Sequence, residues 1–124
     1  MPPKRARLGD FGEQAAATYL LRRGYTLVAR KWRCAHGELD LVMHEGPVLV
    51  FVEVRARQGA EPGLAEQSIG PAKQVRLAAL AYAFLEAHAI DQSHPWRIDV
   101  VAIDLDRAGR VARINHIRDA VEEA

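Results

Sequence analysis

Two carboxylates interrupt the most strand-like runs of this chain. Asp40 lies between Leu39 and Leu41, and Glu53 lies within the run Val48 to Val54, whose other residues are nearly all β-branched or aromatic. Such a run is typical of a strand at the centre of a sheet. A carboxylate is costly there unless a cation or several hydrogen-bond donors compensate it. The two acids therefore indicate a site that binds a cation.

Strand geometry predicts that Asp40 and Glu53 are neighbours. The residues Glu45-Gly46-Pro47 are typical of a tight reversal, which makes the two runs an antiparallel hairpin. Asp40 then lies opposite either Phe51 or Glu53, and in both registers the two acids share one face of the sheet. Their backbones are about 5–8 Å apart in either case.

Two acids at this separation are suited to a divalent cation. Side chains alternate along a strand, so Glu38 is expected on the face of Asp40, and Leu39 and Leu41 on the other face. Carboxylate oxygens favour Mg²⁺ or Mn²⁺, hard ions that keep several of their waters. The alternative is a half-exposed hairpin without a metal, whose acids form ion pairs with arginines: Arg33, Arg55 or Arg57.

The chain contains a set of short motifs in a characteristic order. They are Gly12-Glu13, the segment Gly37 to Val42, the segment Val50 to Val54, Lys73 after an open loop, and the segment Arg97 to Val100. In these motifs the chain resembles the YraN family of small bacterial endonuclease-like proteins. That family is similar to the PD-(D/E)XK nuclease superfamily, which includes archaeal Holliday junction resolvases and restriction endonucleases.

The resemblance implies a restriction endonuclease-like core and metal-dependent hydrolysis of DNA phosphodiester bonds. By their positions in the motifs, Asp40 and Glu53 are the implied ligands of Mg²⁺ or Mn²⁺. Glu13 is implied as the helical acid that joins them, and Arg55 completes the expected catalytic set.

Arg55 is the main departure from the family pattern, which has lysine at this position. A lysine can lose its proton on burial and orient or deprotonate a water, whereas an arginine stays charged and is better suited to gripping phosphate. We therefore expect a slow nuclease in which Arg55 neutralises charge on the phosphoryl oxygens. Two alternatives stay open: a nucleic-acid-binding module that has lost catalysis, and an adaptor protein whose acids only form ion pairs.

Basic residues at the start of a helix suggest where nucleic acid binds. Pro71 opens a helix that is expected to end near His88, and Lys73 and Arg76 follow within about one turn. Cations there oppose the helix dipole, but they reinforce the free N–H groups in binding phosphate. The alternative is that Lys73 is a solvated side chain. The residues expected to contact nucleic acid, DNA in the first place, are Arg57, Lys73, Gln74 and Arg76.

Hydrophobic periodicity predicts the order α-β-β-β-α-β-β, an α/β fold with a mixed β-sheet flanked by helices. The first helix is expected from Leu8 to Arg23, and Gly24 ends it. A strand follows from Tyr25 to Arg33, and the segment from Arg57 to Gly70 is expected to be irregular. The residues expected to face inward from the first helix are Phe11, Ala15, Tyr19 and Leu20.

The last part of the chain is expected to add two strands. The strand Trp96 to Asp104 should lie parallel to the strand of Glu53, because a helix separates them and a right-handed crossover joins such strands. Arg97 and Asp99 are expected on its outward face, and Val111 to Ile117 forms an edge strand. The residues expected to face inward from the second helix are Val75, Ala78, Ala79, Tyr82 and Leu85.

Composition places the chain among soluble globular proteins. At 124 residues, 49% hydrophobic and 27% charged, it is expected to form a single domain over residues 1–124, with residues 1–8 as a flexible basic arm. Eight basic and two acidic residues among the first 33 suggest a phosphate-binding surface. We expect a cytoplasmic protein without a membrane partner, since no run is long enough to span a bilayer and Cys34 is the only cysteine. The oligomeric state stays open, and a homodimer is compatible with the sequence.

Overall fold

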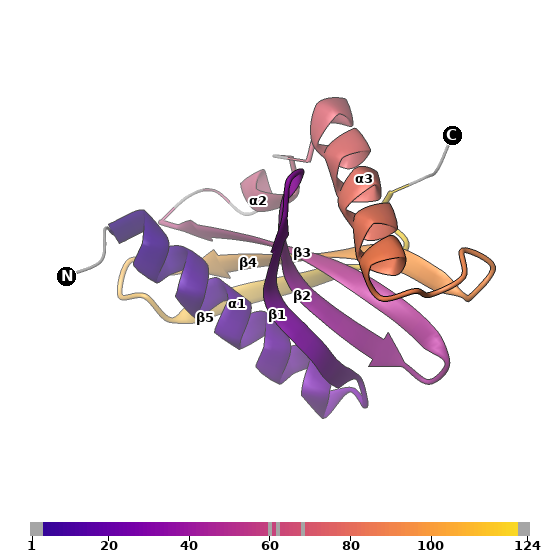
Figure 1. Cartoon of the computed structure of the whole chain (residues 1–124). Helices are drawn as coiled ribbons and strands as arrows, with labels where there is room; N and C mark the ends of the chain where they lie inside the picture. The colour runs from indigo at the N-terminus through magenta and orange to yellow at the C-terminus, as the bar shows by residue number, and fades with distance from the viewer. Residues whose placement is uncertain (1–3, 60, 62, 68, 122–124) are drawn as a thin grey trace.

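The computed structural model describes residues 4–59, 61, 63–67 and 69–121, and it contains a five-stranded sheet with helices on both faces (Figure 1). The strands lie in the order β1-β2-β3-β4-β5, and all neighbours are antiparallel except β3 and β4, which are parallel. The expected α/β class and mixed sheet are therefore confirmed. The elements are α1 (Lys4–Arg22), β1 (Thr26–Cys34), β2 (Gly37–Glu45), β3 (Val48–Gln58), α2 (Leu64–Gln67), α3 (Pro71–Ala87), β4 (Trp96–Leu105) and β5 (Val111–Ile117).

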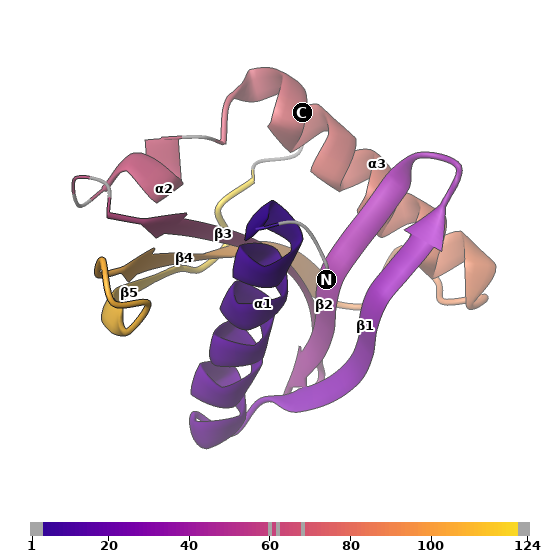
Figure 2. The ribbon, with the colours of Figure 1, turned by 90° about the vertical axis from the view of Figure 1, so that its left-hand side faces the viewer.

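Two hydrophobic clusters hold the helices against the sheet. The cluster on the α1 face includes Ala16, Leu20 and Val52, and the cluster on the α3 face includes Phe51 and Phe84. Figure 2 shows α1 on one side of the sheet and α3 on the other. The central strand β3 contributes to both clusters, because its residues alternate between the two faces.

The buried stripes of both helices differ from those expected. Phe11 of α1 is 45% exposed, whereas Leu20 is fully buried as expected, and the small residues Gly12 and Ala16 also face the sheet. In α3, Val75 is 71% exposed and Tyr82 is 37% exposed. Small residues let a helix approach the sheet closely, and a stripe of small residues gives little hydrophobic periodicity. The residues of α3 that are buried are Leu77, Leu80, Ala81, Phe84 and Leu85.

Two segments are more regular than expected. Helix α1 begins at Lys4, within the segment 1–8 for which we expected a flexible arm, while residues 1–3 lie outside the described residues. The segment expected to be irregular from Arg57 onward contains the end of β3 and the short helix α2.

Arg97 and Asp99 do not point into solvent, so this expectation was wrong. Asp99 is fully buried, and it accepts hydrogen bonds from Arg97 Nε at 2.9 Å and from the Asp119 N–H at 3.0 Å. Its second oxygen lies 2.8 Å from His116 Nε2, and Arg97 also donates to the Tyr25 hydroxyl. Both faces of the sheet are covered, so polar residues of β4 satisfy one another inside.

The alternation of β2 is interrupted next to Asp40. Leu41 packs in the α1-face cluster, whereas Leu39 packs in the α3-face cluster, although we expected both leucines on one face. In the β1–β2 register, Lys31 of β1 and Asp40 of β2 both lie between the pairs Arg30–Leu41 and Trp32–Leu39. Lys31 has a φ of 49°, a left-handed conformation that is uncommon for lysine. The two strands are therefore irregular at the same level.

None of the helices in the described part of the chain is long and apolar enough to cross a membrane.

Gly12 sets the distance between α1 and β3, and its replacement should separate them. A Cβ at Gly12 would lie 2.8 Å from Ala56 Cβ and 3.6 Å from Val54 Cγ1. We expect Gly12→Ala to lower the free energy of unfolding by about 1–3 kcal/mol, the usual cost of overpacking, as measured by urea denaturation. Gly9→Ala is the matched control, because a Cβ at Gly9 meets nothing within 4 Å. It should stabilise the helix by about 0.5–1 kcal/mol, and equal effects of both variants would contradict the close approach.

Candidate active site

Asp40 lies where β2 and β3 stop pairing. The paired residues end with Leu41 and Val52, although both strands continue beyond that point. The Val54 N–H donates a hydrogen bond to Asp40 Oδ2 at 2.8 Å, so a side-chain oxygen takes the place of a backbone acceptor. The end of the ladder thus fixes the Asp40 carboxylate against β3.

Glu53 is almost completely buried, and its carboxylate contacts a lysine and a second carboxyl group. Its exposed fraction is 5%, and Lys73 Nζ of α3 lies 2.8 Å from Glu53 Oε2. Asp40 shares a hydrogen bond with Glu53. The Lys73 ammonium is thus a charge-assisted partner of Oε2. A cation from α3 therefore balances the buried charge of Glu53.

Two further carboxylates converge on Asp40. Single oxygens of Glu13, Glu38 and Asp40 all lie within 4.8 Å of one another. Glu13 is supplied by α1, and Lys31 Nζ lies 3.2 Å from it. Such a set of hard oxygen donors suits a divalent cation, so the residues present fit the metal that the resemblance implies.

Glu38 also lines the pocket, although the sequence motifs placed it only on the face of Asp40 and gave it no role. Its Oε2 accepts a hydrogen bond from Arg33 Nε at 2.6 Å, and its side chain is 28% exposed. The signal that could have found it is its spacing of two residues from Asp40, which places both acids on one side of β2.

The acids of the site influence one another's ionisation. Burial and the neighbouring Glu53 carboxylate raise the pKa of Asp40 well above its usual value. Burial also raises the pKa of Glu53, but Asp40 and the Lys73 ammonium outweigh it and hold that pKa below its usual value. Burial raises the pKa of Glu13, against the opposing effect of Lys31. Without a cation, one proton is therefore retained between Asp40 and Glu53 near neutral pH.

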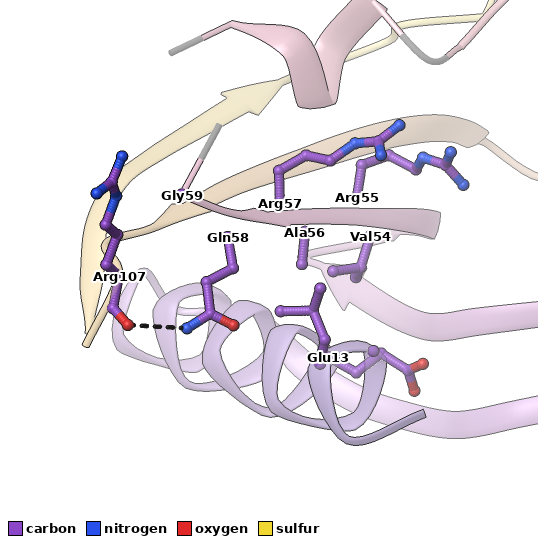
Figure 3. Close-up of a pocket in the computed structure, with 10 residues that line it drawn as sticks. Glu13, Val54, Arg55, Ala56, Arg57, Gln58, Gly59 and Arg107 are labelled. Atoms are coloured by element: carbon purple, nitrogen blue, oxygen red, sulfur yellow. Dashed lines mark hydrogen bonds between the residues drawn. The ribbon is translucent and has the colours of Figure 1, made fainter. Parts of the chain in front are cut away.

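The structure brings most of the expected residues into one pocket. A pocket of about 380 Å³ is lined by the four acids and by three cations. Arg57 does not line this pocket, but it lines a larger groove that continues from it (Figure 3). Gln74 lines neither space, and its Nε2 lies 3.5 Å from the Ile69 carbonyl oxygen. The acids of the pocket are Glu13, Glu38, Asp40 and Glu53, and its cations are Arg55, Lys73 and Arg76.

Comparison with known proteins identifies the family. The model of the family described as "Uncharacterised protein family UPF0102" matches residues 12–103, more than half of the chain. The chain belongs to this family. UPF0102 is the YraN family, so the resemblance seen in the motifs is confirmed.

Relatives from several bacteria match over nearly their whole length. The chain is 56% identical over 124 residues to a UPF0102 protein of Roseiflexus castenholzii, with each chain fully covered. It is 51% identical over 123 residues to one of Chloroflexus aurantiacus, with 99% of each chain covered. It is 48% identical over 120 residues to one of Pelotomaculum thermopropionicum, covering 97% of this chain and 99% of the relative.

Asp40→Asn tests the ionisation of the site. Because the folded-state pKa of Asp40 is raised, its contribution to stability is fully present below its unfolded-state pKa and is lost as pH rises toward the folded-state value. An asparagine can accept the hydrogen bond from the Val54 N–H and donate one to Glu53 without a charge. In EDTA at neutral pH, we expect Asp40→Asn to raise the free energy of unfolding by on the order of 1 kcal/mol.

The same variant reports on metal binding. Mg²⁺ or Mn²⁺ should raise the melting temperature of the native protein by binding to the folded state, and this increment should be absent in Asp40→Asn. Thermal unfolding followed by circular dichroism, with and without the ion, measures both effects. A native protein that shows neither stabilisation by metal nor calorimetric binding at millimolar concentration would rule out the metal site.

Proposed function

We propose that this protein is a nuclease that hydrolyses phosphodiester bonds of nucleic acid, DNA in the first place, with the help of Mg²⁺ or Mn²⁺. The observation that carries the proposal is the convergence of four carboxylates on one pocket, where Lys73 Nζ lies 2.8 Å from the buried Glu53 Oε2. The resemblance of the family to the PD-(D/E)XK nucleases supports the same reading.

The donor set indicates which residues would hold the ion. Asp40 and Glu53 would be its ligands, with Glu13 and Glu38 close enough to Asp40 to hold it directly or through water. A divalent ion bound there supplies a Lewis acid that stabilises charge on a phosphoryl oxygen and lowers the pKa of a coordinated water. The Val54 N–H keeps Asp40 oriented for this purpose.

The cations of the pocket have separate roles. Lys73 Nζ, 2.8 Å from Glu53 Oε2, is placed to orient the attacking water and to balance the charge of the acids. Arg55 lines the same pocket, and its charge contributes to the lowered pKa of Glu53. Its guanidinium is suited to gripping the phosphate oxygens. Arg76 lies on the same rim and adds attraction for the phosphate.

Cleavage assays test the proposal directly. The native protein should cleave at least one of single-stranded, duplex or branched DNA with Mg²⁺ or Mn²⁺, and Asp40→Asn and Glu53→Gln should each abolish cleavage. Arg118→Ala is the matched control, since Arg118 is a cation of another region that pairs with Glu45 at 2.7 Å. No cleavage of any of these substrates with either ion would refute the nuclease and leave the nucleic-acid-binding module.

Lys73 changes what we expect of Arg55. The sequence alone predicts that Arg55→Lys would restore a missing lysine and speed up cleavage. The structure instead has Lys73 of α3 beside Glu53, so a lysine is already present. We therefore expect Arg55→Lys to cleave within a few-fold of the native rate. Lys73→Ala should lower the single-turnover rate by about 10²–10⁴, the usual cost of losing a positioned acid–base or orienting group.

Lys73→Arg is the conservative variant that separates charge from orientation. It keeps the positive charge, so substrate affinity should be retained, but a guanidinium places its donors farther out and does not lose a proton. Its single-turnover rate should stay as low as that of Lys73→Ala. If Lys73→Arg cleaves at the native rate while Arg55→Lys is much faster, Arg55 rather than Lys73 limits the reaction.

A further inference from the structure

A second, larger cavity continues from the acidic pocket. It is a groove of about 1070 Å³ that runs along β3 to Arg107, in the turn between β4 and β5 (Figure 3). The groove and the acidic pocket share several lining residues, so one ligand can occupy both. The shared residues are Gly9, Glu13, Val54 and Arg55.

The groove exists because one edge of β3 is uncovered. Pairing with β2 ends at Val52, whereas pairing with β4 continues to Gln58. The edge of β3 beyond Glu53 therefore faces α1 instead of another strand, and Leu8 and Gly9 of α1 form the opposite wall. N–H groups of an uncovered strand edge are donors that can contact phosphate oxygens.

Arginines follow this edge. In Figure 3, Arg55 and Arg57 leave β3 on the side away from Glu13, and Arg107 continues the row at the far end. In the described part of the chain, Arg57 and Arg107 form no ion pair with a carboxylate. Five arginines outside this groove are instead paired with carboxylates: Arg33, Arg97, Arg110, Arg113 and Arg118.

We propose that this groove binds one sugar–phosphate strand of nucleic acid, with Arg57 and Arg107 contacting successive phosphates away from the acidic pocket. This inference rests on the proposed function. It adds the path along which the substrate lies and the expectation that the substrate is single-stranded there. From Glu53 to Gln58, β3 extends about 17 Å at 3.3 Å per residue, enough for several phosphates.

The shape and lining of the groove favour a single strand. The arginines form a single row along β3 and the following turn, which matches the single row of phosphates of one backbone. None of the described residues that line the groove is aromatic. Recognition would therefore depend on phosphates rather than on base stacking, and it would be independent of sequence.

Binding measured without cleavage tests this proposal. The probe is a fluorescein-labelled oligothymidylate, and its anisotropy is followed in EDTA over a series of salt concentrations. Arg57→Ala and Arg107→Ala should each weaken binding and flatten the slope of log affinity against log salt by about 0.7, the value for one phosphate contact on a single strand. Melting temperatures should stay at the native value, because both side chains are exposed.

Arg110→Ala is the matched control. Arg110 lies three residues from Arg107 next to the same turn, but it pairs with Asp106 at 3.2 Å and does not line the groove. Its replacement should leave affinity and salt slope unchanged. Native-like binding by both groove variants, or an equal loss in Arg110→Ala, would overturn the proposal. So would unlabelled duplex DNA that competes as well as single-stranded DNA of the same length.

The outcomes separate the groove from the catalytic proposal. If the groove variants weaken binding while no substrate is cleaved under any metal condition, the groove stands and the nuclease falls. If the native protein cleaves DNA but both variants bind the probe like the native protein, the nuclease stands and the groove falls.

Discussion

The charge of Glu53 in the middle of the sheet is the constraint on which the site depends. Glu53 belongs to β3, the central strand of the sheet, which has two strands on each side. Only 5% of the residue is exposed. An unpaired charge in this position would destabilise the fold strongly. Lys73 provides the opposite charge and Asp40 a hydrogen bond, so α3 and β2 must both be placed where these contacts are possible. The same contacts fix the position of the acids relative to one another.

The backbone around these acids departs from regular structure in three places, and each departure opens or shapes the site. Pairing of β2 with β3 ends before Asp40, which frees the Val54 N–H for the Asp40 carboxylate. Lys31 takes a left-handed conformation opposite Asp40 and reaches the acids of α1. Gly12 lets α1 approach β3 closely, which carries Glu13 to the site. A fully regular sheet would leave no cavity at this point.

Much of the fold and part of the site followed from the sequence. Length, alternation and turn residues predicted the elements and the hairpin that brings Asp40 beside Glu53. They failed at Leu39, where the alternation of β2 is interrupted beside the left-handed Lys31 of β1, because no local pattern predicts that conformation for a lysine in a strand. The inward face of α3 was misjudged since its alanines allow several helix faces to look apolar. The partnership of Lys73 with Glu53 joins distant segments, so residue spacing could not predict it.

A second buried acid on the same sheet shows what a purely structural carboxylate looks like here. Both oxygens of Asp99 have close partners, in Arg97, His116 and the Asp119 N–H. Glu53 instead shares its pocket with three more acids, an arrangement that raises the pKa of Asp40. Asp104 has one oxygen without a partner among the described residues, and its other oxygen is bound by Arg113. Acids that only form ion pairs would be arranged as at Asp99. Acids that raise the pKa of Asp40 in a pocket continuous with an arginine-lined groove support the proposal of a cation held between the carboxylates and a phosphate.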